Sequence, residues 1–171
     1  MASRKKTLMY VRVCLGLFFV GILFGLHTVV FVRAETTWMA DLFGRGTFVE
    51  ERWPTVAAWF EHLHIAFATT YTTYPVIAYC MDWLGYACIV LAVLMVGAIK
   101  DPVRNIWIVQ AFMVGCAIAF VMPLMMGPLR GIPLFWRLID SSFGLVGFFL
   151  LLFPYRLIRG LEASTARQDH V

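Results

Sequence analysis

A carboxylate and an imidazole lie inside two of the most apolar stretches of this sequence. Asp82 lies about six residues from the nearer end of one stretch, or roughly 9 Å deep at 1.5 Å per residue, and His27 lies at a similar depth in another. Ionisable groups in apolar helices usually face a partner or a cavity, so the two form a candidate polar pair that could bind a ligand. Alternatively, Asp82 reaches the membrane interface and bonds a backbone group or a Tyr hydroxyl.

A second group of polar residues, Arg130, Arg137 and Asp140, surrounds a turn rich in Gly and Pro. Guanidinium groups are planar and bind phosphate or carboxylate through two parallel hydrogen bonds, so the two arginines suit an anionic ligand. Two serines follow Asp140, which is also typical of the N-cap of a helix. In that alternative, Asp140 caps the helix and an arginine pairs with it or with a lipid headgroup.

The remaining chemistry-bearing residues do not predict a metal or another cofactor. Glu61 and His64 are three residues apart, and Glu-x-x-His on a helix is half of a di-iron carboxylate site, but the sequence lacks the other half. Haem between helices needs two facing histidines, and only His27 lies in a long apolar stretch. The cysteines lie in apolar stretches without a C-x-x-C pair, as expected of small buried residues: Cys14, Cys80, Cys88 and Cys116.

Composition identifies the elements that must position these residues. The chain is 61% hydrophobic and 14% charged, whereas soluble domains carry roughly 25% charged residues. A helix needs about 20 apolar residues to cross a bilayer. We therefore predict an all-α integral membrane protein, a four-helix transmembrane bundle formed by residues 1–161 as a single domain. Four segments qualify as spans, 8–32, 76–99, 106–126 and 141–157.

The ends of these spans need separate interpretation. Residues 8–32 follow a basic start, as in a signal peptide, but the apolar stretch is too long for one, so we expect a retained span. Pro154 should bend or end the fourth span. Asp101 and Pro102 should cap and begin the third, in which Gln110 is placed to bond another helix. Residues 162–171 form a polar tail, expected to be cytoplasmic and unstructured.

The outer segment, residues 33–75, separates the first two spans. Its first half is polar and loop-like as far as Gly46. From Pro54 onward, apolar residues recur every three or four positions, which predicts an amphipathic interfacial helix on the membrane surface. A shorter apolar segment between Pro133 and Asp140 repeats this on a smaller scale. The predicted stripe consists of Val56, Phe60, Leu63, Phe67 and Tyr71.

Lys and Arg residues predict the orientation. With the N-terminus inside, nine of the 14 basic residues lie on the inner side and five on the outer side, so both termini should be cytoplasmic. The net charge of +4 is therefore a feature of the inner leaflet, and no nucleic-acid partner is predicted. The inner residues are Arg4, Lys5, Lys6, Arg12, Lys100, Arg104, Arg156, Arg159 and Arg167, and the outer ones are Arg33, Arg45, Arg52, Arg130 and Arg137.

Three segments in the second half carry a resemblance: residues 101–107 (DPVRNIW), 127–133 (GPLRGIP) and 136–144 (WRLIDSSFG). This region resembles a family of small, uncharacterised bacterial inner-membrane proteins with four predicted spans. The resemblance implies a multi-pass protein of the bacterial inner membrane, and it implies no activity.

These observations favour a non-catalytic membrane protein that binds a lipid-like ligand or a partner protein at its outer face. His27 and Asp82 would form a buried polar floor, and Arg130, Arg137 and Asp140 the rim. One alternative is a small membrane enzyme acting on a lipid or isoprenoid substrate, with Asp82 or His64 transferring a proton. Another is an accessory subunit of a larger membrane complex. An enclosed pocket that holds Asp82 beside a second titratable group favours the enzyme, and an exposed, flat apolar flank favours the subunit.

Overall fold

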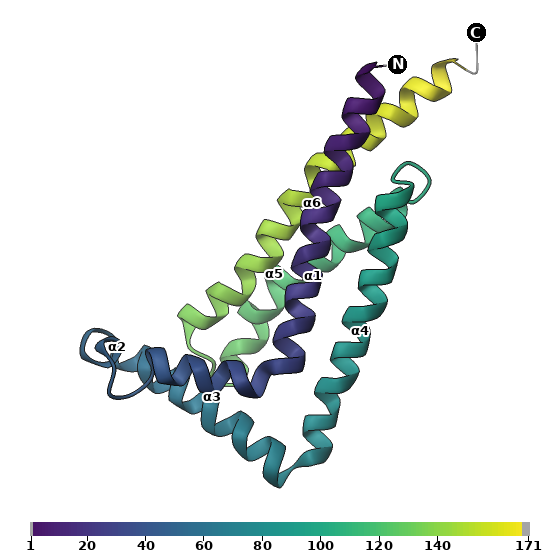
Figure 1. The fold of residues 1–171 in the computed structure, drawn as a ribbon. Coiled ribbons are helices and arrows are strands. Elements are labelled where there is room, and N and C mark those ends of the chain that lie inside the picture. The colour runs from purple at the N-terminus through teal and green to yellow at the C-terminus, as the bar shows by residue number, and fades with distance from the viewer. Residues whose placement is uncertain (1, 169–171) are drawn as a thin grey trace. The chain divides into compact units, whose positions relative to one another are not determined.

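The computed structural model is helical over nearly all of the chain that it describes, which is the backbone of residues 2–168 and the side chains of residues 4–163 (Figure 1). Four of its helices are long and apolar enough to cross a membrane, and they include the four predicted spans. The predicted all-α class is therefore confirmed. The helices are α1 (Ala2–Phe43), α2 (Phe48–Arg52), α3 (Pro54–Thr73), α4 (Pro75–Lys100), α5 (Ile106–Leu129) and α6 (Leu134–Gln168).

The described chain divides into two compact units. One is Ile22–Val90, and the other combines the residues before Ile22 with those after Val90. The boundaries fall inside α1 and α4, so each of these two helices belongs partly to each unit. The assignment of residues 1–161 to a single domain stays a prediction.

Helix α1 continues well past the predicted end of the first span. The loop predicted after residue 32 is wrong: the chain stays helical to Phe43 and bends at Phe31, which has non-helical dihedral angles (φ −105°, ψ 16°). Thr28 donates a hydrogen bond to the Phe24 carbonyl before the bend, and Thr36 donates to the Val32 carbonyl after it. Such bonds satisfy the hydroxyls inside a helix and favour bending, so these polar residues do not end α1.

A short loop and α2 connect α1 to α3. Gly46 adopts a left-handed conformation (φ 80°), which glycine accepts readily. Thr47 then caps α2 by accepting a hydrogen bond from the Val49 N–H, while Glu50 accepts one from the Gly46 N–H at 2.7 Å. This arrangement is close to a capping box, in which a Thr and a Glu three residues later satisfy the first free N–H groups.

Helix α3 packs against the end of α1 within the same unit. The rings of Phe43 and Phe60 lie 5.3 Å apart, and Tyr71 lines a shallow pocket with residues 30–41 of α1. These contacts make the two segments run antiparallel. The predicted apolar stripe of α3 is half-buried in the structure, and Ala57 beside it is fully buried. At least part of the stripe therefore contacts protein.

The turn between α4 and α5 is fixed by Asn105. Its side-chain amide donates to the carbonyls of Gly97 at 3.1 Å and Asp101 at 3.0 Å, which satisfies groups left free at the end of α4. The prediction that Pro102 begins the third span is wrong, because α5 begins at Ile106. Asp101 caps the turn by accepting a hydrogen bond from the Arg104 N–H.

The chain leaves α5 through a Schellman motif. Ile132 N–H donates to the Gly127 carbonyl, and Gly131 N–H donates to the Pro128 carbonyl. Gly131 has a φ of 67°, the left-handed conformation that this motif requires. Arg130 is the C-cap residue. The motif places α6 directly beside α5 (Figure 1).

Helix α6 begins earlier and ends later than predicted. It starts at Leu134, so the short segment before Asp140 belongs to it, and Asp140 is not an N-cap. Pro154 lies inside the helix and does not end it. Membrane helices tolerate proline where neighbouring groups satisfy the freed carbonyl. The helix continues to Gln168, so the unstructured tail is wrong for residues 162–168, and residues 169–171 lie outside the described chain.

Helices α5 and α6 pack closely because glycines face the contact. A Cβ atom added at Gly144 would lie 2.6 Å from the Cys116 carbonyl oxygen and 2.8 Å from the Ala119 carbonyl carbon. A Cβ at Gly147 would lie 2.9 Å from Cys116 Sγ. Small residues let backbones approach, and close van der Waals packing is the main attraction between helices in lipid. Phe18 of α1 extends this core by packing edge-on to Phe112 at 5.4 Å.

Candidate functional site

A groove runs along α5 and α6 within one unit, and we call it the Met groove. Its volume is about 740 Å³, within the usual range for small-molecule sites. The α5 residues that line it share one helix face, and four of the lining residues are methionines, whose flexible side chains adapt to irregular ligands. The lining residues are Gln110, Met113, Val114, Ala117, Ile118, Val121, Met122, Met125, Met126, Phe148 and Tyr155.

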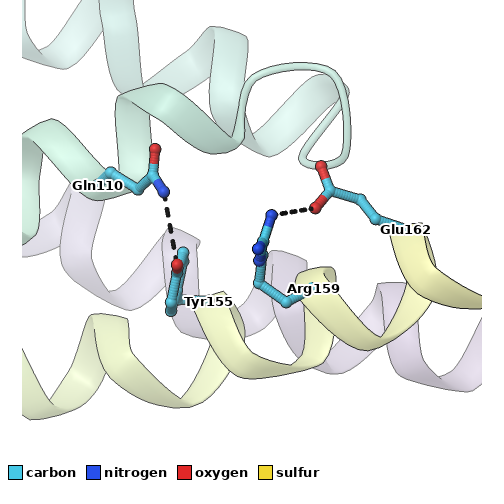
Figure 2. Close-up of polar contacts among 4 residues, drawn as sticks. All are labelled: Gln110, Tyr155, Arg159 and Glu162. Carbon is cyan, nitrogen blue, oxygen red and sulfur yellow. Dashed lines mark hydrogen bonds and ion pairs between the residues drawn. The ribbon is translucent and has the colours of Figure 1, made fainter.

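Polar groups occur at one end of the Met groove only. There, Gln110 Nε2 donates a hydrogen bond to Tyr155 Oη at 3.4 Å, which joins α5 to α6 (Figure 2). The sequence predicted an interhelical bond from Gln110, and the structure confirms it. From Gln110 to Met126 the groove follows α5 for about 24 Å, at 1.5 Å per residue. The groove is therefore long, with one polar end and an apolar body.

An ion pair lies next to the polar end. Arg159 Nη1 and Glu162 Oε2 are 3.3 Å apart, with side chains 62% and 31% exposed (Figure 2). Residues four and seven positions after Tyr155 share its helix face, so this pair follows the groove along α6. The predicted site did not include any of these residues.

Near the opposite end of α5, Arg137 of α6 is half-buried and Ser141 of α6 is buried. The Arg137 side chain lies against the face of Gly127, and its Nε atom is buried without a hydrogen-bond partner in the described chain. Ser141 is 2% exposed, and its hydroxyl likewise has no described partner. Burying a polar group without a hydrogen bond costs stability, so we expect these two groups to weaken the α5–α6 contact.

The other predicted rim residues are more open. Arg130 is exposed at the end of α5, and Asp140 is half-buried within α6. Arg130, Arg137 and Asp140 belong to one unit, whereas His27 and Asp82 belong to the other. Whether the five residues form one ligand site stays a prediction.

His27 and Asp82 do not form the predicted pair in this structure. His27 Nδ1 instead contacts Glu35 Oε1 at 2.8 Å, and its ring lies against Phe31. Asp82 is exposed on α4, beside an edge-to-face series of exposed aromatic rings: Tyr79, Trp83 and Tyr86. The bend in α1 lies between His27 and Glu35 and brings this carboxylate to the imidazole.

Helix α3 places Glu61 and His64 in half-buried positions. His64 Nδ1 is buried and has no hydrogen-bond partner in the described chain. The residues with described placement contain no group of three or more His, Cys, Asp or Glu side chains that could hold a metal ion.

Sequence reasoning missed the Met groove as a site. A signal was available, because the 24-residue helix α5 contains four methionines: Met113, Met122, Met125 and Met126. In a membrane helix, however, apolar residues occupy every face, so periodicity does not distinguish a groove from a lipid-facing surface. The groove depends on which face of α5 the residues of α6 leave open.

Comparison with known proteins found no match to a family model, to a curated protein sequence or to a solved structure. The resemblance in residues 101–144 therefore stays a prediction. The fold and this geometry define the class as an all-helical chain with four helices able to span a membrane.

Proposed function

We propose that this chain is a multi-pass integral membrane protein that holds one chain of a lipid-like amphiphile in the Met groove, without catalysing a reaction. The observation that supports this most directly is the groove's lining, which is apolar along its length and polar at one end. An amphiphile has the same distribution of polarity. The attraction would be van der Waals packing, because an alkyl chain leaves the bilayer for an equally apolar wall.

The dimensions support an alkyl chain as the occupant. About 24 Å of groove corresponds to most of the roughly 30 Å hydrocarbon thickness of a bilayer. A chain lying along α5 would therefore run with the lipid tails, and its polar group would lie at Gln110 and Tyr155. With both termini cytoplasmic, this end faces the inner leaflet.

We further propose the bacterial inner membrane as the location, from the distribution of basic residues and the resemblance. In this placement α3 lies at the outer surface. Asp82 is about 27 Å from Lys100 along α4, which puts it near the outer boundary of the hydrocarbon and not deep within it. The exposed rings of Tyr79, Trp83 and Tyr86 support this placement, because Tyr and Trp concentrate at membrane interfaces.

The proposal is tested by blocking the groove. Ala117 lines it, so Ala117→Trp should fill part of its length, whereas Ala87→Trp adds the same side chain to an exposed position of α4. Native mass spectrometry of protein released from mild detergent, after incubation with a long-chain phospholipid, measures retained lipid. We expect the parent and Ala87→Trp to retain it and Ala117→Trp to lose most of it.

Two outcomes would refute lipid binding in the groove. One is equal retention by Ala117→Trp and the parent, which would place any lipid elsewhere. The other is a parent protein that retains no phospholipid but carries a co-purifying membrane protein that Ala117→Trp loses. That second result would favour the accessory-subunit alternative, with a partner helix in the Met groove.

A further inference from the structure

Two opposite charges follow the polar end of the Met groove along α6, and this one helix sets their spacing. Tyr155, Arg159 and Glu162 follow one another on the same face of α6, and the two charged side chains are 3.3 Å apart (Figure 2). Both are accessible from outside the protein, Arg159 more than Glu162. A headgroup attached to a chain in the groove would therefore meet Tyr155 first and the ion pair one turn later.

Each member of the pair has bonding capacity to spare. Arginine has five N–H donors, and Glu162 occupies one of the terminal nitrogens. A carboxylate accepts about four hydrogen bonds, and Arg159 accounts for one. The pair can consequently accept an anion at the guanidinium and a cation at the carboxylate without being separated.

We propose that the ligand of the Met groove is a phospholipid with a zwitterionic headgroup that carries a primary amine, a phosphoethanolamine. This inference rests on the proposed function. Its phosphate would bond Arg159, whose planar donors suit phosphate oxygens, and its ammonium group would donate to Glu162. The Tyr155 hydroxyl, already bonded to Gln110, lies where the headgroup joins the chain.

Charge and hydrogen-bond donors explain why other headgroups fit less well. A headgroup with only negative charge, such as phosphoglycerol, meets Arg159 but is repelled by Glu162 beside it. A phosphocholine is also zwitterionic, but its quaternary ammonium has no N–H and cannot donate to the carboxylate. Because both side chains are substantially exposed, water screens these effects, and we expect a preference of about two- to fivefold.

The test compares three phospholipids with identical acyl chains, carrying phosphoethanolamine, phosphoglycerol or phosphocholine. Each is offered in equimolar competition to the full-length protein in detergent, and native mass spectrometry counts the retained species. The parent should prefer phosphatidylethanolamine. Glu162→Gln should lose this preference and gain phosphatidylglycerol, while Arg159→Gln should weaken retention of all three phospholipids relative to the parent.

Arg156→Gln is the matched control, because Arg156 is an exposed arginine of the same helix that neither lines the Met groove nor pairs with Glu162. It should behave as the parent. If Arg156→Gln and Arg159→Gln have equal effects, or if the parent retains the three lipids equally, the headgroup inference is overturned while groove binding stands. If Ala117→Trp retains as much lipid as the parent, the proposed function itself fails.

Discussion

His27 and Glu35 contact each other across the bend in α1, with Nδ1 and Oε1 2.8 Å apart. Eight residues of straight helix would separate their positions by about 12 Å along the axis. The non-helical conformation of Phe31 between them shortens this distance, and the Phe31 ring lies 4.8 Å from the imidazole. The pair therefore links the two arms of α1 and should favour the bent form.

Glu35→Gln should loosen this bend. The pair is partly exposed, with His27 57% and Glu35 20% accessible, so its loss should cost no more than about 1 kcal/mol of stability. The geometric effect should be clearer: spin labels at Leu23 and Met39 should show a broader distance distribution by pulsed electron resonance. Asp41→Asn, at an exposed acid on the same helix arm, is the control. An unchanged distribution in Glu35→Gln would show that the backbone alone sets the bend.

Gly144→Ala and Gly115→Ala should have opposite effects on stability. An alanine at position 144 would press on the α5 backbone and cost roughly 1–3 kcal/mol, whereas Gly115 has no atom near its missing Cβ. Alanine is the better helix former, so Gly115→Ala should be neutral or stabilising by up to about 1 kcal/mol. Thermal melting in one detergent compares them. Equal melting temperatures would refute the close contact of α5 and α6.

Ser141→Ala should not destabilise the protein, although Ser141 is buried. Its hydroxyl has no described partner, so replacing it with a methyl group removes an unsatisfied polar atom and should leave stability equal or raised by about 1 kcal/mol. Ser142→Ala is the comparison, since that hydroxyl donates to the Ile139 carbonyl at 2.6 Å. A clear loss of stability in Ser141→Ala would mean that a bound water or ligand satisfies this hydroxyl.

Asp82→Ala should leave thermal stability unchanged or slightly raised. The sequence placed Asp82 deep in the membrane with a buried partner, where its loss would cost roughly 3–5 kcal/mol. In the structure it is exposed, and exposed substitutions usually fall within about 0.5 kcal/mol. Melting in detergent, with Asp41→Asn as an exposed reference, measures the difference. A drop of several kcal/mol would restore the buried-partner interpretation.

The orientation is tested by labelling introduced cysteines. Gly46 lies in the loop before α2, so Gly46→Cys should react with an impermeant thiol reagent from the outside, and Ser3→Cys and Ser164→Cys only from the cytoplasm. The four native cysteines would first be replaced by serine or alanine. Labelling of Gly46→Cys from the cytoplasmic side alone would reverse the proposed topology and place the Met groove's polar end in the outer leaflet.

The amino-acid sequence by itself determined the helical class and the apolar cores of the four long helices, because about 20 apolar residues in a row have no stable alternative to a helix in lipid. It also identified Gln110, since a lone polar side chain in an apolar helix needs a partner. The tertiary structure decided two features that hydrophobic periodicity does not encode. Because α1 bends at Phe31, His27 contacts Glu35 and not Asp82. The glycines of α6 fix how α6 packs on α5, and therefore which face of α5 stays open as the Met groove. Both outcomes depend on contacts between segments. When every face of a helix is apolar, the hydrophobic pattern of the sequence does not reveal those contacts.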